Sequence, residues 1–322
     1  MSGGTVVSAG AELASGRVTV VIPTRNRAAL LAQAIDSALG QTAAERCDVV
    51  VVDDGSTDDT PAVARRYGSR IRYIRQRQGG VSAARNTAVY ACPNEFTAFL
   101  DDDDLWAAEK IERQLAALAR WPEAVLVTNL ARARSADGRE RLHGVPAIRL
   151  DGPTDLAPPL FENNFVPTPT VMVRTRALHA VGLFDTRLRC AEDGYTWARL
   201  ACRGPGVFLA EPLTTFRAAT DGLSGDLERL LRYQLRIRYR LASELRRRPD
   251  CRPHWHRGLA RALTDLRDLA YRRGDFATAA RYGLHSLLHR PWGRSRWEWY
   301  RLIESACRAA FGGGQTGVDS TS

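Results

Sequence analysis

Four consecutive aspartates, Asp101, Asp102, Asp103 and Asp104, directly follow the apolar stretch 96–100 (FTAFL). Like charges this close repel each other, so such a run is stable only in open water or around a cation. A solvated acidic loop is one interpretation. The other is a divalent metal site, because ligands gather beyond the carboxyl ends of strands in open α/β sheets, and Mg²⁺ and Mn²⁺ prefer oxygen ligands. The position of the run after an apolar strand favours the metal site.

The front of the chain alternates between two hydrophobic patterns. Apolar runs of strand length stand at 17–23, 47–52, 71–74, 95–100 and 124–130, and segments with helical spacing stand at 27–39, 58–67, 81–92 and 107–120. Strands that alternate with helices predict an α/β fold with a mostly parallel sheet between helices. Such a sheet gathers its functional loops at one edge, which here are 23–26, 53–56 and 101–104.

The alternation changes character after residue 130. Residues 135–169 are predicted to be loop, followed by a strand at 170–173, helices at 175–181 and 192–202, and a strand at 206–210. Beyond 226 the leucine spacing predicts helices, with a turn at Gly274-Asp275. We expect a flexible leader (1–16), an α/β domain (17–225, in halves 17–130 and 131–225), a helical extension (226–308) and a disordered tail (309–322).

The net charge of +10 is concentrated in the helical extension. Residues 227–308 hold 20 arginines and 8 acidic residues, a net +12, so the rest of the chain sums to −2. Basic residues interleaved with Trp255, Trp292, Trp297 and Trp299 are typical of contact with an anionic membrane or a lipid-linked acceptor. The alternatives are packing on the α/β domain, a homodimer or another partner. No nucleic-acid-binding module is visible in the sequence, so no nucleic acid is expected as a partner.

Sequence features also predict the compartment. No apolar run is long enough to span a bilayer, and residues 1–16 lack the basic start and apolar core of a secretory signal. The 6 cysteines include no Cys-x-x-Cys pair, which disfavours a zinc site and is typical of reduced thiols. We expect a cytoplasmic protein, either free or peripheral at the inner face of the membrane.

Five motifs follow one another along the chain: VVIPTRN (20–26), VVDDGSTDDT (51–60), GGVSAARN (79–86), FLDDDDLW (99–106) and CAEDGYTW (190–197). In this order and spacing they closely resemble the inverting glycosyltransferases of family 2, over about residues 17–225. The resemblance implies the GT-A fold and transfer of a sugar from a nucleotide diphosphate sugar, with UDP-sugars the expected donors. The halves 17–130 and 131–225 would then bind the nucleotide sugar and the acceptor.

The resemblance implies a donor site at the sheet edge. Asp54 would accept a hydrogen bond from the base imide, and Asp53 would line the same pocket. Arg85 would lie near the nucleotide, because a guanidinium suits phosphate oxygens; an ordinary salt bridge at a helix surface is the alternative. The expected nucleotide-sugar-binding residues are Pro23, Thr24, Arg25, Asn26, Asp53, Asp54, Gly80, Arg85, Asp101 and Asp102.

The acidic run corresponds to the Asp-x-Asp element of the family. Asp103 is the expected direct ligand of Mn²⁺ or Mg²⁺, with Asp101 as its partner, and the metal would stabilise the negative charge that develops as the sugar–phosphate bond breaks. Asp102 fills the variable middle position. Asp104 would orient a water or cap the helix expected near Ala107.

The same resemblance implies a general base near the end of the family segment. Asp193 would remove the acceptor proton in a single displacement that inverts the anomeric centre. Glu192 is the alternative base, or a residue that orients Asp193. The competing interpretation is an acidic pair that is simply favoured by the dipole at a helix N-terminus.

Two positions depart from the family pattern. Gln78 stands where many relatives have Asn, and Ala219 stands where the segment beginning at Phe216 often ends in His. We expect a metal-dependent inverting glycosyltransferase that acts on a saccharide or lipid-linked acceptor in cell-envelope polysaccharide or glycolipid assembly. The alternatives are glycosylation of a peptide or secondary metabolite, and a non-catalytic nucleotide-sugar-binding protein. Nucleotidyl transfer is disfavoured because the first strand leads into PTRNR, which has no Gly-rich loop.

Overall fold

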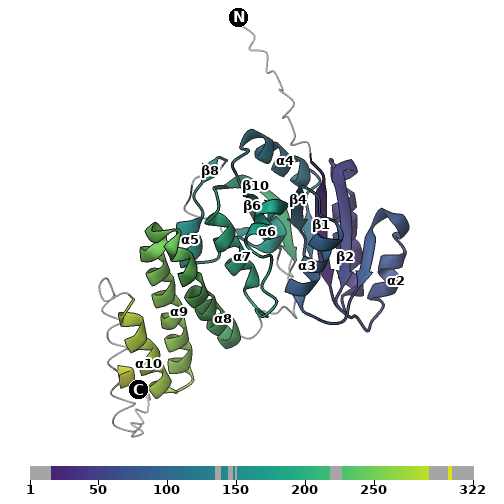
Figure 1. Ribbon diagram of the computed structural model, residues 1–322. Coiled ribbons are helices and arrows are strands. Elements are labelled where there is room, and N and C mark those ends of the chain that lie inside the picture. The colour runs from purple at the N-terminus through teal and green to yellow at the C-terminus, as the bar shows by residue number, and fades with distance from the viewer. Residues whose placement is uncertain are drawn as a thin grey trace, which may run out of the picture. The chain divides into compact units, whose positions relative to one another are not determined.

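The computed structural model describes residues 16–134, 139–143, 148, 151–217, 227–289 and 304–306. The chain divides into two compact units, and Figure 1 labels many of their helices and strands. Unit 1 consists of residues 1–157 and 164–221, and unit 2 consists of residues 158–163 and 222–322. The leader (1–15), the tail (309–322) and Ala219 lie outside the described residues.

The described residues of unit 1 form a ten-stranded sheet. Its main order is β3 (Arg72–Arg75), β2 (Cys47–Asp53), β1 (Val18–Thr24), β4 (Phe96–Phe99), β9 (Met172–Arg174), β6 (Leu126–Arg134), β10 (Gly206–Arg217) and β5 (Asp104–Trp106); β7 (Glu140–His143) pairs with β6, and β8 (Pro153–Thr154) pairs with β10. The strands β3, β2, β1 and β4 run parallel, as do β6 and β10. Strand β9 is antiparallel to both β4 and β6, so it joins the two parallel parts.

Helices pack on both faces of this sheet. They are α1 (Ala28–Leu39), α2 (Thr60–Arg65), α3 (Val81–Ala91), α4 (Lys110–Arg120), α6 (Thr175–Ala180) and α7 (Glu192–Ala201), with short 3₁₀ turns at Ala44–Arg46, Gly68–Arg70 and Thr168–Thr170. On one face Ile22 of β1 shares a core with Leu31 of α1 and Leu115 of α4. On the other face the rings of Phe99 and Trp197 lie 5.6 Å apart. Every residue of β1 and β4 is buried, which explains their mostly apolar sequences.

Unit 1 contains elements that the sequence did not predict. Strand β10 continues to Arg217 instead of ending near 210, because its register shifts around Pro212 and it then pairs with β6 again. Strand β5 occupies 104–106, so α4 begins at Lys110 instead of 107. The stretch 135–169 includes β7 and β8 of unit 1, and α5 (Ala157–Glu162), most of which belongs to unit 2. These elements have 2 to 6 residues, too few for a periodic signal.

The described residues of unit 2 are mainly helical, as the sequence predicts. They form α8 (Leu227–Leu241), α9 (Arg252–Arg272) and α10 (Phe276–Leu287), with 3₁₀ turns at Ala242–Arg246 and Pro249–Cys251. The predicted turn between α9 and α10 is confirmed. Gly274 adopts the left-handed conformation with φ 77°, and Asp275 caps α10 by accepting a hydrogen bond from the Thr278 backbone N–H at 3.0 Å. In the part of the chain that the structure describes, no helix is both long and apolar enough to cross a membrane.

Candidate active site

The loops that follow β1 and β2 are tied together by Asn26. Its backbone N–H donates to Ser56 Oγ at 3.0 Å, and its Oδ1 accepts from the Thr57 N–H at 2.7 Å. Asn26 has a φ of 54°, a left-handed conformation that Asn tolerates better than most residues. Pro23 and Thr24 are buried at the end of β1, and the remaining predicted residue of this loop, Arg25, is exposed. The structure therefore brings two of the predicted loops together at one edge of the sheet.

Asp53 and Asp54 hold two different turns. Asp53 is fully buried and accepts hydrogen bonds from the Ser56 N–H at 2.7 Å and the Tyr73 hydroxyl at 2.6 Å. The carboxylate of Asp54 accepts from the backbone N–H groups of Gly79 at 2.7 Å and Gly80 at 2.8 Å. Asp54 thus fixes the Gly-rich turn before α3, a role that its strand-end position does not reveal. Its contact with a base imide stays a prediction.

Glycine is required at one position of this turn. Gly80 has a φ of 90°, which strains any residue with a Cβ, and its N–H is directed at Asp54. The backbone of Gln78 passes close to Gly55: a Cβ on Gly55 would lie 3.2 Å from the Gln78 backbone N. The two carboxylate oxygens of Asp54 accept three hydrogen bonds here, the third from Gln76 Nε2 at 2.7 Å. A carboxylate offers about four acceptor sites, so room is left for one more donor.

Arg85 of α3 lies at the centre of the site. It is buried, and it donates from Nη1 to Glu192 Oε1 at 2.8 Å and from Nη2 to Asp101 Oδ1 at 2.9 Å. Its guanidinium also lies 5.3 Å from the ring centroid of Phe184. Burial opposes the charge, but Asp101 and Glu192 outweigh it and raise the pKa of Arg85 above its usual value. The salt bridge considered for Arg85 is therefore real, but it is buried and joins two predicted functional segments.

The four aspartates of the acidic run divide by exposure. The side chains of Asp101 and Asp103 are 30% and 21% exposed, whereas Asp102 and Asp104 are buried. Burial raises the pKa of Asp102 to about 7 and raises the pKa of Asp104 well above its usual value. The two carboxylates that solvent reaches are those predicted to hold a metal. Asp104 lies in β5 and accepts from the Arg217 N–H at 3.3 Å, so its predicted role as a helix cap is wrong.

Two arginines that the sequence analysis did not assign to the site hold the acidic run in place. Arg27 forms ion pairs with Asp103 Oδ2 and, at 3.7 Å, with Asp102 Oδ1. Arg217 donates to the backbone carbonyls of Asp103 at 2.6 Å and Asp102 at 3.2 Å. Arg27 follows the first motif directly, and Arg217 belongs to the segment that departs from the family pattern. The positions of Arg27 and Arg217 beside family motifs gave a weak indication of a role in the site. That both arginines bind the acidic run could be found only in the folded chain.

The two acidic residues predicted as candidates for the general base, Glu192 and Asp193, begin α7. Ala191, just before it, has a φ of 56°, a strained conformation for a residue with a Cβ. Glu192 is buried against Arg85, while Asp193 is partly exposed. Asp193 Oδ2 accepts from Asn164 Nδ2 at 3.2 Å and from Thr168 Oγ1 at 3.3 Å. Burial raises the pKa of both acids against the opposing charge of Arg85. The partly exposed carboxylate of Asp193 is therefore better placed than the buried Glu192 to accept a proton.

Comparisons with known proteins identify the family of this chain. The model of the family described as glycosyl transferase family 2 matches residues 19–182. This chain belongs to glycosyltransferase family 2. An uncharacterised glycosyltransferase of Rickettsia bellii is 30% identical over 65% of this chain, and the matched part is 30% of that relative. The chain thus spans less than a third of the length of this relative.

Solved structures of glycosyltransferases share the fold of this family 2 chain. TarS 1–349 of S. aureus in complex with UDP has a TM-score of 0.62 at 18% identity, covering 90% of this chain and 88% of that one. The mannosyltransferase PcManGT of Pyrobaculum calidifontis, in complex with GDP-Man and Mn²⁺, has a TM-score of 0.58 at 19% identity, covering 92% and 87%. The predicted family and the GT-A fold with a helical extension are confirmed.

The family 2 site has oxygen donors suited to a hard divalent cation. The described residues contain no group of three or more His, Cys, Asp or Glu side chains placed to hold a metal. Asp101 and Asp103 supply two carboxylates, each bonded to an arginine through one oxygen. Mg²⁺ is commonly bound through one or two carboxylates together with substrate phosphates and water, so two carboxylates fit this class of site. The histidines of unit 2 are engaged elsewhere: His256 Nδ1 lies 3.1 Å from His289 Nδ1.

Proposed function

We propose that this chain is a metal-dependent inverting glycosyltransferase that moves a sugar from a nucleotide diphosphate sugar to an acceptor hydroxyl. The observation that carries the proposal is the buried bridge from Asp101 through Arg85 to Glu192. The bridge connects the acidic run, where a donor diphosphate would be neutralised, to the start of α7, where the acceptor would lose its proton. A sugar placed between these two groups has its leaving group and its nucleophile on opposite faces.

The donor would bind along the edge formed by the β1 and β2 loops and the Gly-rich turn. Asp54 and its turn would receive the base, and the loop 23–26 would border the nucleoside. A UDP-sugar is our proposed donor, supported by the TarS structure that holds UDP. Arg85 would act on the diphosphate through Asp101, because its Nη groups already bind carboxylates.

Asp103 and Asp101 would hold the divalent cation, Mn²⁺ or Mg²⁺. When bound, the cation supplies Lewis-acid stabilisation of the charge that develops on the leaving diphosphate. Arg27 and Arg217 fix the loop that carries these carboxylates, so the two ligands are oriented before a donor arrives. Mn²⁺ in the PcManGT structure supports the choice of metal.

Asp193 would act as the general base. Its carboxylate is oriented by Asn164 and Thr168, and its raised pKa suits it to accept the acceptor proton. Glu192 is buried against Arg85, so we assign it a positioning role. Attack on the anomeric carbon from the face opposite the leaving group would invert the configuration in one step.

The acceptor we propose is a saccharide or a lipid-linked saccharide of the cell envelope, modified on the cytoplasmic side of the membrane. The net charge of +12 over residues 227–308 supports contact of unit 2 with an anionic surface or an anionic acceptor.

A panel of sugar nucleotides tests the proposal. Purified protein would be incubated with UDP-glucose, UDP-N-acetylglucosamine and GDP-mannose, each with Mn²⁺, with Mg²⁺ or with EDTA, and release of nucleoside diphosphate would be measured. We expect release with at least one donor, and a loss of release in EDTA and in the Asp193→Asn variant. The absence of both donor binding and nucleoside diphosphate release across the panel would overturn the proposal. Release that is unchanged in EDTA would overturn its metal dependence.

A further inference from the structure

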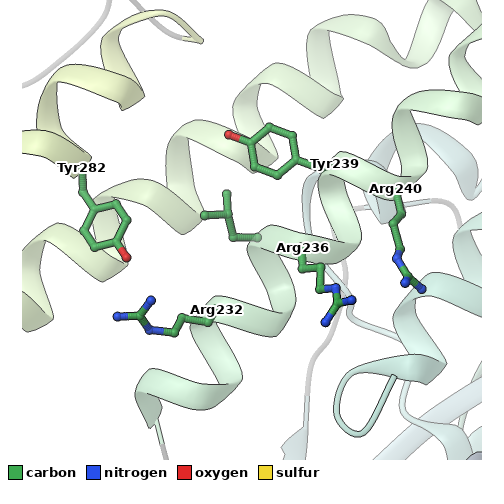
Figure 2. A pocket seen from close by; sticks show the side chains of 6 residues that line it. Arg232, Arg236, Tyr239, Arg240 and Tyr282 are labelled. Atoms are coloured by element: carbon green, nitrogen blue, oxygen red, sulfur yellow. The ribbon is translucent and has the colours of Figure 1, made fainter. Parts of the chain in front are cut away.

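A pocket in unit 2 has a lining unlike that of an ordinary helix–helix contact. It lies between α8 and α10, has a volume of about 500 Å³, and is shown in Figure 2. A pocket of about 300–1,000 Å³ is the usual size for a small-molecule site. Its lining residues are Arg232, Leu235, Arg236, Tyr239, Arg240 and Tyr282.

Three arginines form one wall of this pocket. Arg232, Arg236 and Arg240 follow one another at four-residue spacing along α8, so they lie on the same face of the helix. Like charges at this spacing repel each other and destabilise a helix. The opposite face of α8 buries Leu231 and Leu241. The arginine face is therefore not needed to build the core, and its mutual repulsion would be relieved by an anion.

One carboxylate beside this wall, that of Glu228, is shared between two arginines. Glu228 accepts from Arg232 Nε at 2.8 Å, and its other oxygen pairs with Arg273. This arrangement orients Arg232 while one negative charge is divided between two guanidinium groups. Arg236 is exposed on the same face, one turn further along α8. The wall thus keeps a net positive charge that suits phosphate oxygens.

The other lining residues suit a ring-shaped group. Figure 2 shows Tyr282, which comes from α10, with its hydroxyl directed toward Arg232. Tyr239 is held by His285: the two rings are stacked with centroids 6.3 Å apart, and the Tyr239 hydroxyl lies 3.1 Å from His285 Nε2. A phosphate ion alone would leave most of the pocket empty. Two aromatic side chains beside the arginines offer an apolar face and hydroxyl groups to a second, larger part of the ligand.

We propose that the α8–α10 pocket binds a phosphorylated saccharide, with its phosphate on Arg236 and Arg232 and its sugar ring against Tyr239 and Tyr282. The pocket would give the enzyme an acceptor-binding site for a glycan that carries phosphate. This assignment of the acceptor class rests on the proposed glycosyl transfer, but the binding itself does not require a donor or a metal.

Titration calorimetry of the full chain in EDTA tests the pocket. EDTA removes divalent cations, so metal-dependent binding at the acidic run does not contribute. We expect glucose 1-phosphate to bind about tenfold more tightly than inorganic phosphate, and glucose to show no heat of binding. Arg236→Glu should weaken the binding of glucose 1-phosphate by more than about tenfold, because a charge-assisted hydrogen bond becomes a repulsion.

Two further variants separate the pocket from the general charge of unit 2. Arg246→Glu makes the same charge change at an exposed arginine outside the pocket lining and should leave binding unchanged. Tyr282→Ala should reduce the affinity for glucose 1-phosphate to that for inorganic phosphate. Tyr282→Phe is the matched variant that keeps the ring. Circular dichroism checks that the helices are intact in both variants.

Absence of binding to the wild-type chain, or equal weakening by Arg236→Glu and Arg246→Glu, would overturn the proposed site. An unchanged preference for glucose 1-phosphate in both Tyr282 variants would overturn its saccharide part. Binding of glucose 1-phosphate is measured without a nucleotide sugar, so its result does not depend on whether the chain transfers sugar from a donor. Nucleoside diphosphate release without binding of glucose 1-phosphate removes this inference alone. Binding of glucose 1-phosphate with neither donor binding nor release removes the proposed transfer and the acceptor assignment that rests on it, but leaves the binding site.

Discussion

Arg85 and Glu192 form a buried ion pair with 2.8 Å between Nη1 and Oε1, although 107 positions separate them in the chain. Because the same guanidinium also binds Asp101 at 2.9 Å, α3 fixes the distance between the acidic run and the first turn of α7. The predicted metal-binding run and the first turn of α7, which carries the predicted general base, are therefore held by one side chain, and that side chain need not touch the reacting atoms.

Loss of Arg85 should destabilise the fold as well as the site. Arg85→Met leaves the buried Glu192 without its partner, and we expect the free energy of unfolding to fall by about 3–5 kcal/mol. Arg17→Met is the control, because its pair with Asp48 is 52% and 38% exposed and such pairs contribute about 1 kcal/mol or less. Urea denaturation at pH 7 measures both. Equal losses in the two variants would contradict the central role of Arg85.

Asp193→Asn should separate chemistry from donor binding. The amide cannot accept the acceptor proton, so we expect the rate of transfer to fall about 10²–10⁴-fold. The affinity for the nucleoside diphosphate, measured by calorimetry, should change little, because the donor loops follow β1, β2 and β4. A variant with an unchanged rate would exclude Asp193 as the base.

Gly194→Ala should alter the pH dependence of the reaction. A Cβ at this position would lie 3.0 Å from Asn164 Cβ and 3.1 Å from its Nδ2, so Asn164 must shift and its bond to Asp193 must weaken. That bond stabilises the charged form of Asp193 and lowers its pKa, against the larger opposing effect of burial. We therefore expect the acidic limb of the rate profile to move to higher pH. Asn164→Ala should move it in the same direction, and an unshifted limb in both variants would count against the assignment.

Asp103→Asn should weaken metal binding. We expect the Mn²⁺ concentration for half-maximal binding in the presence of UDP, followed by electron paramagnetic resonance, to rise about tenfold or more, because an anionic ligand becomes a neutral amide. Glu211→Gln removes an exposed carboxylate of β10 that pairs with Arg113 and should leave that concentration unchanged. Equal Mn²⁺ binding by both variants would remove Asp103 from the metal site.

Lys110 should make stability depend on pH. It is fully buried, and burial lowers its pKa well below the usual value, while its Nζ donates to Gln114 Oε1 at 2.8 Å. Between the folded-state pKa and the unfolded value of about 10.4 the unfolded chain binds the extra proton, so this group's contribution to stability rises with pH. We expect the wild type to gain stability relative to Lys110→Met from pH 7 to pH 10, by up to about 1.4 kcal/mol per pH unit. Denaturation curves of the two proteins measured across this range test it; parallel curves would contradict it.

The sequence by itself determined the order of strands and helices in residues 17–130, because β1, β2 and β4 are mostly apolar and the apolar residues of the segments between them repeat with helical spacing. It also determined that 23–26, 53–56 and 101–104 share one edge, since parallel strands end on the same side of a sheet. The helical character of α8, α9 and α10 and the turn at Gly274 followed from the same kind of local pattern.

Only the tertiary structure decided which charges meet. Arg217 and Asp103 are 114 positions apart, and β10 reaches Arg217 only because it pairs with β6 and β5 beyond an irregular register. The split of the four aspartates into two buried and two partly exposed groups likewise depends on β5 and its neighbours. Periodicity records which face of a segment is buried, but a contact between distant side chains depends on how the segments pack, and no local pattern carries that information.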